Sequence, residues 1–142
     1  MQASKSDIRL ELDQLYNSSI LVNADRERVQ QVLTNLIMNS IKYGKKKGTT
    51  EISVQPIYEN KIIVRVRDNG LGIGEEHLPR LFERFYRVDK SGNRRKGGTG
   101  LGLAIVKHII EAHNEQIFIE SKPAIGSEFS FTLDKAILVE AS

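Results

Sequence analysis

Two glycine-rich segments constrain the fold of this chain most, because each lies at a boundary between predicted elements of secondary structure. Residues 68–74, DNGLGIG, follow a predicted strand directly, and residues 97–103, GGTGLGL, lead into a predicted helix. Glycine has no side chain, so its backbone can approach a flat ring or a phosphate group closely. Both segments therefore indicate places where the backbone holds a ligand.

The rest of the chain shows the periodicities of helices and strands. Apolar side chains recur at helical spacing over residues 25–44, where Asp25 is the predicted N-cap, and over residues 100–113. A shorter helical pattern covers residues 78–82. Strands are predicted at residues 8–13, 20–22, 50–57, 61–66, 117–119 and 129–133. The expected fold is an α/β two-layer sandwich, a mixed and mostly antiparallel sheet with helices on one face.

Length and composition favour one soluble domain. A chain of 142 residues fits a single compact domain over residues 1–142. It has no cysteine, and no stretch approaches the roughly 20 apolar residues that cross a bilayer, so we expect a cytoplasmic setting. The net charge of +3 comes mostly from the clusters at residues 45–47 and 94–96, which lack interleaved aromatic residues. Nucleic acid is therefore not an expected partner.

A polar stripe follows the apolar face of the first predicted helix. Asn35, Asn39, Lys42 and Tyr43 stand at positions i, i+4, i+7 and i+8. The amide oxygen of Asn39 suits Mg2+, Lys42 can place its charge against phosphate oxygens, and Tyr43 can cover a base or a ribose. Taken alone, the stripe is better explained as a solvated polar face.

The glycine-rich segments suit the two ends of a nucleotide. Asp68, at the end of a strand, can accept a hydrogen bond from the exocyclic amine of adenine, while the backbone at Gly70, Gly72 and Ile73 lies against the ring. An ordinary turn and a flexible hinge are the alternatives for these two segments. In the second segment, free backbone N–H groups at a helix start suit phosphate, with the Thr99 hydroxyl as a further donor. Its candidate phosphate-binding residues are Gly98, Thr99, Gly100, Leu101 and Gly102.

Together, and in this order, these motifs resemble the ATP-binding catalytic domain of bacterial sensor histidine kinases, which belongs to the GHKL or Bergerat-fold superfamily. The resemblance covers nearly the whole chain. It implies that Asn39 is a Mg2+ ligand, that Asn35, Lys42 and Tyr43 line the nucleotide, and that Asp68 contacts the adenine amine. It also implies a phosphate role for residues 98–102 and a hydrogen bond near adenine from Ser127, which replaces the usual threonine.

The resemblance extends to a phenylalanine motif at residues 81–87, LFERFYR. In the family this motif couples an ATP lid, here about residues 74–98, to the helical domain that carries the acceptor histidine. The implied docking side chains are Phe82, Phe85 and Tyr86, although a small core under the lid is an equal alternative for each ring. Arg84 and Arg87 reach either the γ-phosphate or solvent, and both are candidate catalytic residues with Asn39 and Lys42.

The implied activity is transfer of the γ-phosphate of Mg-ATP to a histidine on a separate dimerisation and phosphoacceptor domain, in two-component signalling. A response regulator is then an indirect partner, the parent protein is anchored in a bacterial inner membrane, and the isolated domain is a monomer. A regulatory nucleotide-binding module and a GHKL-type ATPase are the alternatives. Against the ATPase, Asn35 stands where hydrolysing relatives place a glutamate, and an amide is no general base.

The histidines and the departures from the family pattern complete these expectations. His77, His108 and His113 lack the context of a phosphoacceptor, so we expect no autophosphorylation by this chain alone. After His113 the family usually has Gly-Gly, whereas this chain has Asn114 and Glu115, and Asn114 is expected to end the helix in a left-handed conformation. Ala124 replaces a common glycine. Residues 89–97 are expected to be poorly ordered without nucleotide.

Overall fold

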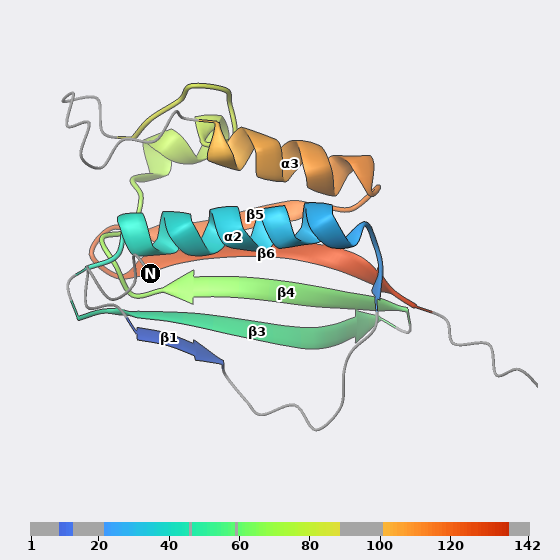
Figure 1. Cartoon of the computed structure of the whole chain (residues 1–142). Coiled ribbons are helices and arrows are strands. Elements are labelled where there is room, and N and C mark those ends of the chain that lie inside the picture. Colours follow the sequence, from blue (N-terminus) through green and yellow to red (C-terminus); the bar gives the residue numbers. More distant parts are fainter. Residues whose placement is uncertain (1–8, 13–21, 46, 59, 89–100, 137–142) are drawn as a thin grey trace, which may run out of the picture.

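The computed structural model describes residues 9–12, 22–45, 47–58, 60–88 and 101–136 (Figure 1). Its helices are α2 (Arg26–Lys42), the 3-10 helix η1 (Glu75–Arg80) and α3 (Gly102–Ala112). Its strands are β1 (Arg9–Leu12), β2 (Val22–Asn23), β3 (Thr49–Tyr58), β4 (Lys61–Asp68), β5 (Ile117–Lys122) and β6 (Gly126–Lys135). None of the helices in these ranges is long and apolar enough to cross a bilayer.

The six strands form one mixed sheet in the order β1-β3-β4-β6-β2, with β5 also paired to β6. The pair β1 and β3 is parallel, and the other four pairs are antiparallel. The hairpin of β3 and β4 forms as predicted, in a register that pairs Thr50 with Asp68. The prediction of a mixed, mostly antiparallel sheet is therefore confirmed.

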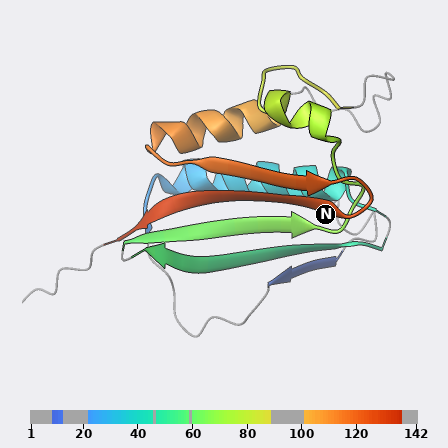
Figure 2. The same cartoon turned by 180° about the vertical axis from the view of Figure 1, so that it is seen from behind.

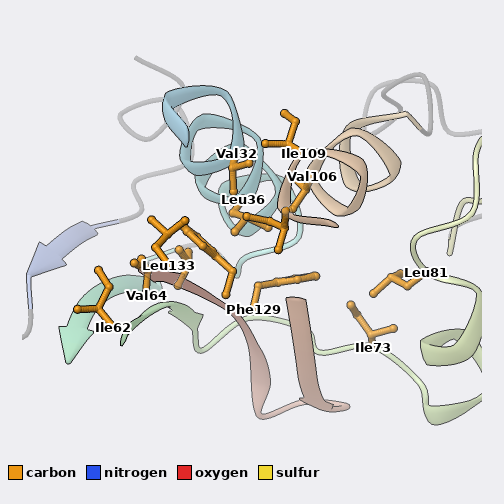
Figure 3. Close-up of a cluster of buried hydrophobic side chains, with 13 residues drawn as sticks. Val32, Leu36, Ile62, Val64, Ile73, Leu81, Val106, Ile109, Phe129 and Leu133 are labelled. Carbon is orange, nitrogen blue, oxygen red and sulfur yellow. The ribbon is translucent and has the colours of Figure 1, made fainter. Parts of the chain in front are cut away.

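Both long helices lie over one face of the sheet (Figure 1), while the opposite face has no helix over it in the described part of the chain (Figure 2). Helix α2 begins as predicted, because the Asp25 side chain accepts a hydrogen bond from the Arg28 backbone at 3.2 Å. Its buried side chains Val32 and Leu36 face Val106 and Ile109 of α3 and Phe129 of β6 (Figure 3). This contact between helices and sheet is the hydrophobic core.

The segment after β4 differs from the prediction of a short helix over residues 78–82. It forms the 3-10 helix η1, which contains Pro79 and ends at Arg80. Pro79 has no backbone N–H to donate, so the helical segment stays short. Leu81 then enters the core, where it lies near Ile73 at one end of the cluster (Figure 3). Residues 89–97, predicted to be poorly ordered, lie outside the described residues.

Two of the departures from the family pattern have structural counterparts. Asn114 ends α3 with a φ of +58°, as predicted for a residue that tolerates the left-handed region. Glu115 turns inward and is buried, where it binds the Lys61 ammonium at 2.7 and 2.8 Å and accepts a hydrogen bond from Thr132 at 2.8 Å. The charge is thus paired with a cation of β4. Ala124 adopts a φ of +66° in the turn between β5 and β6.

Candidate functional site

The C-terminal end of α2 and the turn after β4 pack directly on each other. The Leu71 N–H donates to the carbonyl of Tyr43, the C-cap residue of α2, at 3.2 Å. A Cβ on Gly70 would lie 2.6 Å from the Cα of Gly44 and 2.7 Å from the Tyr43 carbonyl oxygen, so no side chain fits there. This close approach places the polar end of α2 beside Asp68.

Asp68 is buried at this junction, with 8% of its surface exposed. Its Oδ2 accepts a hydrogen bond from the Ser40 hydroxyl at 2.9 Å, and its Oδ1 accepts from the backbone N–H groups of Gly70 at 2.9 Å and Ser127 at 3.3 Å. The donors come from α2, the turn and β6. The carboxylate is therefore fixed in orientation by three separate parts of the fold.

Asp68 belongs to a polar row that crosses four strands. The register pairs Thr50 with Asp68, Asp68 with Ser127, and Ser127 with Ser121. Side chains of directly opposite residues point to the same face of a sheet, which here is the face under the helices. The next row inward is apolar, with Ile52, Val66, Phe129 and Ile119. The polar row thus forms the boundary between the core and this end of the sheet.

Two serines of the row, Ser121 and Ser127, are connected to the turns around Asp68. The Ser121 hydroxyl accepts a hydrogen bond from the Ile73 N–H at 2.7 Å and lies 2.7 Å from the Ser127 hydroxyl. Gly72 has a φ of +72°, and a Cβ there would lie 2.0 Å from the Lys122 carbonyl oxygen. Glycine is therefore required at that position both by conformation and by space. Ile73 itself is buried in the core.

Two cations lie close together near the end of α2. Burial lowers the pKa of the half-buried Lys42, and the nearby Arg87 guanidinium lowers it further by repulsion. The Lys42 ammonium lies 5.4 Å from the centroid of the Tyr43 ring. Within the described residues, neither Lys42 nor Arg87 forms an ion pair with a carboxylate. Such a pair of cations is suited to an anionic ligand. Arg84 is exposed, and no contact in the described ranges connects it to this pair.

Asn39 stands one turn before the end of α2 and is half-buried. Its side-chain amide makes no hydrogen bond to another residue that the structure describes. The described residues also contain no group of three or more His, Cys, Asp or Glu side chains that could hold a metal ion. The amide oxygen of Asn39 is a hard donor of the kind that Mg2+ accepts, so the residue fits a metal whose other ligands come from a bound molecule.

Asn35 and the start of α3 are in contact. The Asn35 amide donates to the Gly102 carbonyl oxygen at 3.3 Å, so this side chain connects the two helices. Helix α3 begins at Gly102 with no side-chain cap and no acidic residue in its first turn. A Cβ on Gly102 would have no neighbour within 4 Å, so packing does not require glycine there. The other predicted phosphate-binding residues of this segment, Gly98, Thr99 and Gly100, lie outside the described residues.

The three aromatic residues of the phenylalanine motif occupy different environments. Phe82 packs edge-on against Phe129 with ring centroids 6.2 Å apart, and it belongs to the core. Tyr86 is half-buried, forms a hydrogen bond with His77, and has the Arg80 guanidinium 4.7 Å from its ring centroid. Phe85 is 69% exposed and has a φ of +65°. Of the three rings predicted to dock a partner, Phe85 alone is largely exposed.

Three residues of the site were missed from the sequence: Ser40, Thr50 and Ser121. Ser40 had a detectable signal, because it continues the buried i, i+4 series of Val32 and Leu36 as a polar residue in a core position. Thr50 and Ser121 had none, since their places beside Asp68 and Ser127 depend on strand register. The sequence does not specify that register by itself.

A mixed sheet with helices on one face, and a buried carboxylate where a helix end meets a glycine turn, define a nucleotide-binding domain of the class shared by histidine kinases and certain ATPases. Residues 24–137 match the model of the family described as histidine kinase-, DNA gyrase B-, and HSP90-like ATPase, and the chain belongs to this family. The fold and the assignment to ATP expected from the sequence are thereby confirmed.

A curated relative of this chain is a sensor kinase. The chain is 46% identical to the sensor histidine kinase YkoH of Bacillus subtilis (strain 168) over 121 residues. The matched region is 85% of this chain and 25% of that protein. The chain thus spans about a quarter of the length of this curated relative.

Solved structures agree with this placement. The nucleotide-free catalytic domain of histidine kinase ThkA matches with a TM-score of 0.75 and 34% identity, covering 94% of this chain and 83% of that one. ThkA is also solved in complex with the response regulator TrrA. Full-length ShkA in complex with AMPPNP matches with a TM-score of 0.80 and 25% identity, covering 96% of this chain and 28% of that one.

Proposed function

We propose that this chain is the ATP-binding catalytic part of a sensor histidine kinase, which transfers the γ-phosphate of Mg-ATP to a histidine on another domain of its parent protein. The observation that carries the proposal is the Asp68 carboxylate, held by three donors at the junction of α2 and the glycine turn. A carboxylate fixed in this way is an acceptor for the exocyclic amine of adenine.

The base then lies against the turn at Gly70, Gly72 and Ile73. A carboxylate has about four lone-pair sites, so one remains for the amine after the three protein donors. Ser127 adjoins Asp68 in the sheet and offers its hydroxyl nearby. Tyr43, at the end of α2, covers the base or the ribose.

Lys42 and Arg87 bind the phosphate oxygens. They are two neighbouring cations without a carboxylate partner in the described ranges. The pKa of Lys42 is lowered first by burial and then by repulsion from Arg87, and a triphosphate would relieve that repulsion. Residues 98–102, before and at the start of α3, supply backbone donors to the same anion. Asn39 holds Mg2+, which supplies charge neutralisation to the phosphates when it is bound. Arg84 is a further cation for the γ-phosphate.

The environment of Asn35 favours transfer over hydrolysis. Its amide nitrogen donates to the carbonyl of Gly102, and the position has no carboxylate that could take a proton from water. A histidine acceptor needs less help, because a neutral imidazole is already nucleophilic near neutral pH. The acceptor belongs to a helical dimerisation domain, and Phe85 is the ring that docks it. A response regulator then receives the phosphoryl group, and the domain lies on the cytoplasmic side of an anchored parent.

Two measurements test the proposal. Isothermal titration calorimetry on the chain should show ATP binding that strengthens with Mg2+, and Asn39→Ala should remove that Mg2+-dependent gain while leaving Mg2+-free binding intact. Mixing the chain with Mg-ATP and the acceptor domain of its parent should label the acceptor histidine, with no steady ADP release in the absence of that domain. Failure to bind adenine nucleotides would refute the nucleotide site, and binding without labelling would leave a regulatory module instead.

A further inference from the structure

Ser40 is a serine in a position that the helix pattern reserves for an apolar residue. It follows Val32 and Leu36 at intervals of four residues, and like them it has 0% of its surface exposed. Its hydroxyl donates to Oδ2 of Asp68 at 2.9 Å, across 28 positions of sequence. A fully buried hydroxyl in a helix interior is favourable only where it is hydrogen-bonded, and Asp68 supplies that partner.

The three donors to Asp68 differ in one respect. Gly70 and Ser127 donate through their backbone N–H groups, which any residue at those positions except proline would supply. Ser40 donates through its side chain, so this bond depends on the amino acid. It is also the bond that occupies Oδ2, whereas both backbone donors lie on Oδ1. Ser40 therefore determines whether a lone pair of Oδ2 remains available to a ligand, and in which direction that lone pair points.

We propose that Ser40 is a positioning residue that sets the base specificity of the site. By donating to Oδ2 it fixes the orientation of the Asp68 carboxylate and turns the remaining lone pair toward the ligand, so that the site selects a base with an exocyclic donor. Ser40 itself does not touch the nucleotide. This inference rests on the proposed adenine contact of Asp68, and it adds the residue on which the strength and direction of that contact depend.

The test compares two nucleotides in the Ser40→Ala variant. Calorimetry with ATP and with purine riboside triphosphate, which lacks the amine, gives the preference for the amine in each protein. Without Ser40 the carboxylate is no longer directed at the amine, and loss of the hydrogen bond between the amine and this charged group corresponds to about a tenfold effect, so Ser40→Ala should bind ATP about tenfold more weakly. Binding of purine riboside triphosphate should stay nearly unchanged. The loss should be the same with Mg2+ and with a chelator, because Asn39 is untouched.

Two further variants separate positioning from a general loss of structure. Ser130→Ala removes another buried serine hydroxyl, on the opposite face of β6, and should leave both affinities unchanged. Ser40→Thr keeps the donor and should restore the preference for ATP. The binding stoichiometry reports the folded fraction, so a poorly folding variant is still judged by the affinity of its folded molecules.

The contradicting outcomes are distinct. A Ser40→Ala protein that keeps the full preference for ATP, or that loses both nucleotides equally, would overturn the role of Ser40 and leave the proposed function standing. If the wild-type protein binds both nucleotides equally, Asp68 does not contact the amine, and the proposed role of Ser40 is then refuted as well. A wild-type protein without affinity for ATP would contradict the proposed function itself.

Discussion

At the scale of single residues, the site combines polar groups that are fully satisfied with others that are not. Asp68 has three protein donors, whereas the hydroxyl of Thr50, its neighbour in the sheet, is buried without a hydrogen-bond partner in the part of the chain that the structure describes. Lys42 is a cation partly removed from water beside another cation. Thr50 and Lys42 therefore both lower the stability of the free protein, Thr50 because its buried hydroxyl is unpaired and Lys42 because its charge is partly buried beside another cation.

Thr50→Val should stabilise the protein. The substitution keeps the shape of the side chain and removes the unpaired hydroxyl, whose burial costs on the order of 1 kcal/mol. Urea denaturation should therefore give a free energy of unfolding about 1 kcal/mol higher than that of the wild type. Thr132→Val is the matched comparison, because Thr132 is also buried but donates to Glu115, and it should be destabilising. If both substitutions changed the free energy of unfolding in the same direction, the cost assigned to the unpaired Thr50 hydroxyl would be contradicted.

Lys42→Met should weaken nucleotide binding while slightly stabilising the free protein. The pKa of Lys42 is lower in the folded state than its ordinary value of 10.5, so folding disfavours the charged form. Between the folded pKa and 10.5 the unfolded chain binds more protons, so wild-type stability should rise with pH across that window. The gain at neutral pH should be below about 0.5 kcal/mol, because solvent screens a partly exposed charge. Thermal melts of the wild type and the variant from pH 7 to 10 measure this difference in stability. A variant that is less stable than the wild type at pH 7 would contradict the prediction.

At the scale of elements, ion pairs stabilise the end of the sheet that lies far from Asp68. Lys61, at the start of β4, binds Glu115 after α3 and also binds Asp134 of β6 at 2.8 Å. Hydrogen bonds to Asp134 and then Glu115 raise the pKa of Lys61, and the bond to Lys61 lowers the pKa of Asp134. This clamp of Lys61, Glu115 and Asp134 holds the turn from α3 to β5 against the hairpin of β3 and β4.

Lys61→Met should lower the thermal unfolding midpoint at pH 7, because it leaves the buried carboxylate of Glu115 without its cation. The contribution of Asp134 is present above its ordinary pKa of 3.8 and is lost as the pH falls through its lower folded value. The difference between wild type and variant should therefore narrow below about pH 4. Lys107→Met, at an exposed position of α3, is the control and should melt as the wild type does at every pH. A constant difference down to pH 2 would argue against the clamp.

At the scale of the whole molecule, both long helices cover one face of the sheet, and the candidate site lies at the end of that layer where α2 stops. The core contains Leu81, and Phe82 packs against it, so the segment after η1 is fixed, whereas Phe85 is exposed. Phe85 is unfavourable in two ways. A positive φ at a bulky residue costs about 1–3 kcal/mol in the backbone, and the apolar ring is exposed to solvent. Such a feature is expected where a partner domain provides compensation.

Phe85→Ala should separate binding from transfer. The ring is 69% exposed, so the affinity for Mg-ATP should stay unchanged, while labelling of the acceptor domain should fall about tenfold or more through loss of an aromatic contact buried in the complex. Phe118→Ala, which removes an exposed ring on β5, should change neither quantity. Equal losses of affinity and labelling in Phe85→Ala would place the ring in the nucleotide site instead.

The sequence by itself determined the local elements and the position of the candidate site along the chain. The N-cap at Asp25, the two helical periods and the hairpin are set by neighbouring residues, and the glycine segment after β4 marks its own close approaches. Strand register and helix packing decided the rest, because they join residues that are distant in sequence. Only the tertiary structure placed Ser40 on Asp68, separated Phe82 from Phe85, and paired Glu115 with Lys61, since each of these contacts depends on which face of an element meets which neighbour.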